Sequence, residues 1–154
     1  MFTVGAFYES IDPAGAYTAI TAALAEQSLR STGTQLFVPE LANIVAVAAG
    51  VETAVESCAR LTSPSLRGMG RLEIEPYSGA AAGAVEPASP PPVYDLRANP
   101  LPLVRDEVLQ AEINSNPVAA QIQWVVVWFA DAPLVPATGN IFTVRATSAT
   151  VLIA

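Results

Sequence analysis

The most apolar stretch of the chain is IQWVVVWFADAP, at residues 122–133. Its β-branched and aromatic residues predict a β-strand, in which successive side chains point to opposite faces. One face carries Trp124, Val126 and Trp128, and the other carries Val125, Val127 and Phe129. Both faces are apolar, whereas a half-buried strand alternates with polar residues. We expect a central strand with Trp128 in the fold's own core and Val125, Val127 and Phe129 facing a neighbouring subunit.

Further strands follow from short apolar or alternating segments. They are expected at residues 2–8, 35–38, 70–77, 108–114 and 140–154. In residues 70–77, Leu72 and Ile74 face inward, and Glu73 and Glu75 face outward. Residues 41–60 are ambiguous, because their apolar positions fit a helical stripe and their β-branched residues fit two strands. The β-branched content favours two strands with a turn near residues 50–53.

An amphipathic helix is predicted over residues 13–30. Asp12 is placed to cap it, Pro13 occupies its first position, and Gly33 lies beyond its end. Tyr17, Ile20 and Leu24 recur at helical spacing.

Residues 78–100 contain five prolines together with many Ala and Gly. This composition predicts a long surface loop or extended arm. Pro90, Pro91 and Pro92 form a stiff polyproline-type segment, and with Tyr94 they are candidate subunit contacts. The strands and turns together predict one mainly β domain over residues 1–154, an antiparallel β-sandwich of jelly-roll type with one N-terminal helix.

Charge is scarce along this chain of 154 residues. Only 14% of the residues are charged, against about 25% in a typical domain. Such a sparsely charged surface indicates contact with other subunits. The net charge of −7 makes direct binding of nucleic acid unexpected. The N-terminus resembles no signal peptide, and the apolar runs are too short to span a bilayer.

The residue inventory excludes the common catalytic constellations. The chain has no His, no Lys and one Cys, so a Ser-His-Asp triad, a Cys-His pair, a Lys Schiff base and a zinc site cannot be assembled. Glu73 and Glu75 form a carboxylate pair that we interpret as outward-facing surface charge. We therefore expect no enzyme, no catalytic residues, no cofactor and no metal. Arg67 and Arg71 are candidates for bidentate contacts to carboxylates of a neighbouring subunit.

The strand pair VLQAEIN and QWVVVWFAD, the closing FTVRATSATVLIA, the Pro-rich excursion at 87–102 and the charge-poor composition resemble a small coat protein of tailless icosahedral phages. That resemblance implies a single jelly-roll capsid subunit that assembles in the host cytoplasm into a virion. Its partners would be copies of itself and other virion proteins, with an internal membrane beside the shell in place of direct genome contact.

A different class of protein also fits the sequence. A β-sandwich module that binds carbohydrate or protein as a homo-oligomer would present aromatic side chains on one face, with Tyr77, Tyr94 and Trp124 as candidates.

Overall fold

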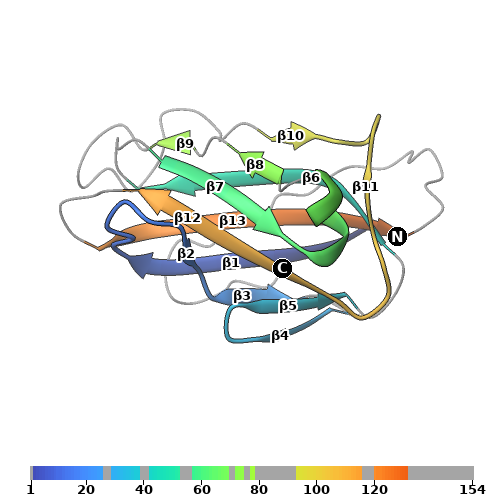
Figure 1. Ribbon diagram of the computed structural model, residues 1–154, viewed down its shortest axis with the longest axis horizontal. Helices are drawn as coiled ribbons and strands as arrows, with labels where there is room; N and C mark the ends of the chain where they lie inside the picture. Colours follow the sequence, from blue (N-terminus) through green and yellow to red (C-terminus); the bar gives the residue numbers. More distant parts are fainter. Residues whose placement is uncertain are drawn as a thin grey trace.

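Two β-sheets packed face to face make up the protein, as a computed structural model shows (Figure 1). The structure describes residues 2–25, 29–38, 42–52, 57–69, 72–74, 77–78, 93–115 and 120–131. The mainly β, sandwich-like architecture predicted from the sequence is confirmed. All strand pairs are antiparallel except that between β6 and the two-residue β9.

The larger sheet has seven strands, whose central order is β10-β6-β13-β1-β3. Its members are β1 (Phe2–Ile11), β3 (Ala22–Ala25), β6 (Ala42–Val51), β9 (Tyr77–Ser78), β10 (Tyr94–Asp95), β11 (Leu101–Leu103) and β13 (Gln121–Asp131). The apolar segment 122–133 thus supplies the middle of this sheet. It pairs with β1 on one side and with β6 on the other.

The smaller sheet has six strands, with the order β4-β5-β12-β7-β8 and β2 paired to β12. Its members are β2 (Thr18–Ala19), β4 (Arg30–Thr32), β5 (Gln35–Val38), β7 (Ser57–Thr62), β8 (Leu72–Ile74) and β12 (Glu107–Ser115). A 3-10 helix, η1 (Pro64–Met69), follows β7. The strands predicted at 2–8, 35–38 and 108–114 are confirmed. Residues 41–60 resolve into β6 and β7, as their β-branched content favours.

The predicted helix at residues 13–30 is wrong. Ala14 and Gly15 adopt positive φ angles of 50° and 74°, and the Asp12 carboxylate accepts a hydrogen bond from the Ala14 amide. This closes a tight turn where a helix would have begun. Two short strands follow it, and then β4 begins at Arg30.

Tertiary hydrogen bonds decide the conformation of this segment. The Ile20 amide donates to the Ala111 carbonyl at 3.0 Å, and the Thr21 amide donates to the Glu9 carboxylate at 2.9 Å. Ile20 is fully buried where the chain crosses from the smaller sheet to the larger one. Bonds to both sheets outweigh a weak local helix propensity, as is common for short segments.

The main core lies between the sheets. On β13 the side chains of Val125, Val127 and Phe129 enter it, and each is at most 2% exposed. These three were the strand's candidate subunit contacts, and the structure corrects that assignment. A side chain enclosed between two sheets offers no surface to a neighbouring subunit.

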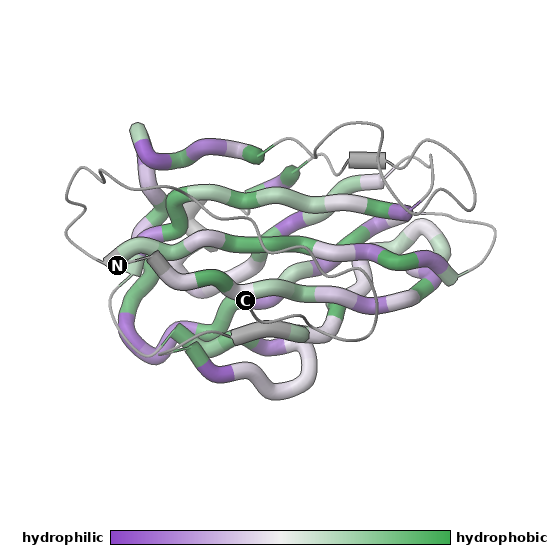
Figure 2. The backbone as a smooth tube through the Cα atoms, turned by 180° about the vertical axis from the view of Figure 1, so that it is seen from behind, coloured by the Kyte–Doolittle hydropathy of each residue, from purple (hydrophilic) through white to green (hydrophobic). Residues whose placement is uncertain are grey.

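The opposite side of the larger sheet is also apolar. We call it the outer apolar face. Its residues are Val4, Ala6 and Tyr8 of β1, Trp124, Val126, Trp128 and Ala130 of β13, and Val45, Ala46, Ala48 and Gly50 of β6. Figure 2 views the molecule from this side and shows the central strands as largely apolar along their middle parts.

Candidate functional site

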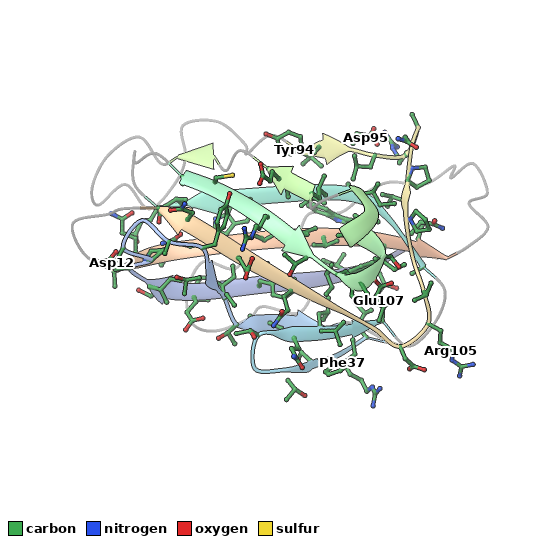
Figure 3. The ribbon with its side chains drawn as sticks, viewed as in Figure 1. Asp12, Phe37, Tyr94, Asp95, Arg105 and Glu107 are labelled. Atoms are coloured by element: carbon green, nitrogen blue, oxygen red, sulfur yellow. The ribbon has the colours of Figure 1, made fainter. Side chains whose placement is uncertain are left out.

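One continuous segment borders one end of the sandwich, and we call residues 93–106 the strap. It contains β10 and β11, both of which pair with β6 at the margin of the larger sheet. Figure 3 shows Tyr94 and Asp95 along the upper edge and Arg105 at a lower corner, with Asp12 at the opposite end of the molecule. The strap therefore connects the edge of the larger sheet to the first residue of β12.

The upper part of the strap is held by an Asp-centred turn. Asp95 accepts a hydrogen bond from the Arg97 amide at 3.0 Å and forms an ion pair with the Arg97 guanidinium. Hydrogen bonds from Arg97 lower the pKa of Asp95 to about 2. The Leu96 amide donates to the Val45 carbonyl at 2.8 Å, and the Leu96 side chain packs against the main core. Backbone and side chain together fix the path of this part.

The lower end is fixed by a buried carboxylate. Glu107 accepts hydrogen bonds from the Val104 amide at 2.7 Å and from the Ser65 hydroxyl at 2.7 Å. The Ser63 hydroxyl and the Ser65 amide donate to it as well. Burial raises the pKa of Glu107, but these hydrogen bonds outweigh burial, so the pKa lies below the usual value. The carboxylate thus joins the strap to η1.

The strap presents apolar side chains to solvent. Among the described residues, the exposed large hydrophobic side chains are Val93 at 47%, Tyr94 at 37% and Val104 at 56%. All three belong to the strap, although the strap is only 14 of the described residues. Single exposed hydrophobics are ordinary, but a concentration on one ordered segment is typical of a contact surface.

A second surface, on the outer side of the smaller sheet where β7 pairs with β8 and with the second half of β12, is polar. Its side chains are Cys58, Arg60 and Thr62 of β7, Glu73 of β8, and Gln110, Glu112 and Asn114 of β12. Arg60 pairs with Glu112 across the two strands, and its guanidinium carbon lies 3.7 Å from the centroid of the Tyr17 ring. A hydrogen bond with Cys58 and then burial raise the pKa of Tyr17 to about 12. These groups satisfy one another within the chain.

Of the other predicted contact residues, some are described by the structure and some are not. Tyr94 lies on the strap and is exposed, so it stays a candidate contact residue. Pro90, Pro91, Pro92 and Arg71 lie outside the described residues, as do the strand predicted at 140–154 and the side chain of Arg67.

Two contact candidates were missed by sequence reasoning. Val93 and Val104 belong to the strap, and each stands directly beside another large apolar residue, Tyr94 and Leu103 respectively. The sequence does not distinguish these two valines from the buried apolar residues of the same stretch, Leu101 and Leu103. The hydrogen bonds of Glu107 likewise had no signal in the sequence, because Glu107 and Ser65 are far apart along the chain.

Within the described part of the chain, no cluster of three or more His, Cys, Asp or Glu side chains is arranged to hold a metal ion. No helix among those residues is long and apolar enough to cross a membrane.

Comparison with known proteins adds no relative. No protein-family model, curated protein or solved structure matches this chain.

Proposed function

We propose that the protein is a structural subunit that self-assembles, and that it is a single jelly-roll coat protein of the kind that forms tailless icosahedral phage shells. The observation that carries the proposal is that the exposed large hydrophobic side chains among the described residues, Val93, Tyr94 and Val104, all belong to the strap. A rigid segment with exposed apolar side chains at one end of a sandwich is suited to end-to-end contact between copies.

The strap's construction supports a contact role. Asp95 and Glu107 hold the two parts of the segment, so little conformational entropy remains to be lost when a partner binds. Repeated end contacts related by rotation generate closed rings, which are the units of an icosahedral shell. Charge scarcity fits the same role, since only 14% of the chain is charged.

The carbohydrate- or protein-binding module remains the alternative from another class. It needs several aromatic side chains on one exposed surface. Tyr94 is exposed, but Trp124 is only partly exposed and lies on the outer apolar face, away from the strap's edge. Tyr94 and Trp124 therefore lie on different surfaces, and the side chain of the third candidate, Tyr77, lies outside the described residues.

The test is the mass of the purified chain in solution, measured by sedimentation velocity and native mass spectrometry. We expect rings or shells, and we expect Val104→Asp to dissociate them without changing the far-ultraviolet circular dichroism. Thr32→Asp, on the exposed edge strand β4, is the matched control and should assemble normally. A monomer that persists at high concentration, together with a saturable response to glycans, would contradict the coat proposal and favour the binding module.

A further inference from the structure

The turn that carries Val104 is built on a buried side chain that can change its charge. Glu107 begins β12 and is 4% exposed, although a carboxylate is rarely buried without a positively charged partner. In place of a cation it has four hydrogen-bond donors, from Ser63, Ser65 and Val104. An ionised carboxylate can accept all four, because neither of its oxygens carries a proton. The surroundings of Glu107 are therefore matched to its charged form.

Protonation of Glu107 removes this match. One oxygen of a neutral carboxyl group becomes a donor, and the remaining hydrogen bonds lose the strength that the charge gave them. The serine hydroxyls can rotate and accept the new proton, but the amides of Ser65 and Val104 can only donate. The backbone of Val104 is thus a group that cannot adapt when Glu107 becomes neutral.

Within the described residues, the other contacts that close the turn at residues 104–107 are weak. Asp106 has a φ of 61°, a left-handed conformation that needs support from the surrounding structure in a residue other than glycine. The Glu107 amide donates to the Val104 carbonyl over a long distance of 3.3 Å. Arg105 and Asp106 approach to 3.7 Å, and both side chains are mostly exposed, so their ion pair contributes little. The turn therefore depends mainly on the Glu107 carboxylate.

The charged residues on the neighbouring elements do not replace this carboxylate. The elements that contact β12 most are β7, β5, β2 and η1. β5 and β2 contain no charged residue, and Arg60 of β7 pairs with Glu112 in the second half of β12. η1 contains Arg67, whose side chain lies outside the described residues. Figure 3 shows Glu107 beside η1, near the corner of the molecule that carries Arg105.

We propose that acid switches the contact surface of the strap, through protonation of Glu107 and opening of the turn at residues 104–107. Val104, which is 56% exposed in the closed turn, then loses its fixed position. The folded pKa of Glu107 lies below its usual value. The carboxylate therefore stabilises the turn fully at neutral pH, and this support disappears as the pH falls through the folded pKa.

The upper part of the strap should stay in place over the same pH range. Asp95, which forms the turn with Arg97, has a pKa of about 2 and remains ionised in moderate acid. The Leu96 amide donates to the Val45 carbonyl, and that hydrogen bond contains no titrating group. Acid should therefore release one end of the strap and leave the other end attached to the larger sheet.

The test is residue-resolved amide hydrogen exchange of the full chain, measured by NMR from neutral pH to about pH 3, below the usual pKa of a glutamate. Each rate is divided by that of the unfolded chain at the same pH. Protection of the Val104 amide should fall about tenfold or more, since it loses a hydrogen bond to a charged group. The Leu96 amide should remain protected. Constant protection of Val104, or simultaneous loss at Val104, Leu96 and β13, would overturn the proposal.

A pair of variants tests the same step at neutral pH. Glu107→Gln should reduce the protection of the Val104 amide without acid, because the glutamine amide group adds donors where acceptors are needed. Glu112→Gln, on the same strand, is the matched control and should leave that protection unchanged. Equal protection of Val104 in the two variants would contradict the proposal. If Glu107→Gln does not fold, the pH series on the native chain decides.

The effect on assembly rests on the proposed function, and sedimentation velocity at the same pH values separates the two. Assemblies present at neutral pH should dissociate over the range in which the Val104 amide loses its protection. Assemblies that persist after that loss would contradict the switch but not the proposed function. A chain that is monomeric at every pH would contradict the proposed function, and hydrogen exchange would still decide whether the turn opens.

Discussion

The two outer sides of this sandwich differ in chemistry. The smaller sheet presents Arg60, Glu112 and other polar groups that bond to one another, as is usual for an antiparallel sheet with one side toward water. The larger sheet presents Trp124, Val126 and Trp128 instead. Two sheets that share one core therefore meet different surroundings on their other sides. On the larger sheet, apolar side chains such as Trp128 are buried even though they lie outside the main core.

The largest expected effect comes from placing one charge at three matched positions. Val127 faces the main core, Val126 faces the outer apolar side, and Thr62 faces the polar outer side. Val127→Asp buries an unpaired charge and should cost more than about 4 kcal/mol, enough to unfold much of the protein. Val126→Asp should cost about 2 kcal/mol, and Thr62→Asp should stay within about 0.5 kcal/mol.

Urea unfolding at neutral pH measures all three variants. The order of the three stability losses tests the difference between the two outer sides, because only the smaller sheet should accept a charge on its outer side. Equal tolerance of Asp at Val126 and at Thr62 would contradict the difference between the two outer sides.

The next effect concerns Glu107, the inward-facing carboxylate at the first position of β12. Glu107→Gln removes the charge that Ser63, Ser65 and Val104 surround, and should cost about 2 kcal/mol at neutral pH. The folded pKa of Glu107 lies below its unfolded value. Its contribution to stability is therefore complete above the unfolded pKa and disappears as the pH falls through the folded pKa.

Denaturant titrations at neutral and at acid pH compare the stability of the native chain with that of the Glu107→Gln variant. The native chain should lose more stability on acidification than the Gln variant does. A parallel decline of both proteins would show that Glu107 is not the group that titrates.

A smaller loss of stability is expected at Gly50, where the larger sheet has no room for a Cβ atom. A Cβ at Gly50 would lie 2.3 Å from Cζ2 of Trp124, so Gly50→Ala must displace the ring. The expected cost is about 1–3 kcal/mol, with a change in tryptophan emission. Gly5→Ala is the control on the inner side, where the nearest atom is Leu36 Cδ2, at 2.5 Å. It should destabilise without moving the emission, and a shift in both variants would argue against flat packing of Trp124 on Gly50.

The smallest effect is expected on the polar side. Arg60 and Glu112 keep 17% and 20% of their side-chain surface exposed. Arg60→Ala should cost about 1 kcal/mol or less, and high salt should reduce that difference. A loss as large as that of Val126→Asp would mean that the smaller sheet is also covered on its outer side.

Much of the fold could be predicted from the period of apolar residues. Short apolar or alternating segments located β1, β5, β12 and β13, because their β-branched and aromatic residues favour strands. The period of apolar residues failed at residues 13–30, where hydrogen bonds to Glu9 and Ala111 from distant strands outweigh local preference. It also could not tell the two sides of β13 apart, since both are apolar and only the position of the second sheet distinguishes them.

The candidate site was less predictable. Tyr94 was found because an aromatic residue stands out in a Pro-rich stretch. The exposure of Val104 depends on the turn that Glu107 holds, in which Asp106 adopts a φ of 61°. That turn depends on a contact with η1, more than 40 residues earlier in the chain.

The comparison of the two outer sides can be tested without any substitution, because the chain has a natural probe on each. Cys58, its one cysteine, lies partly exposed on the polar side, and both tryptophans lie on the apolar side. The decisive measurement is acrylamide quenching of the native tryptophans, with thiol labelling of Cys58 in the same sample. We predict that acrylamide quenches the tryptophans of the folded protein only weakly, whereas the Cys58 thiol reacts in the same sample. Tryptophans quenched as strongly as in the urea-unfolded chain would contradict the account.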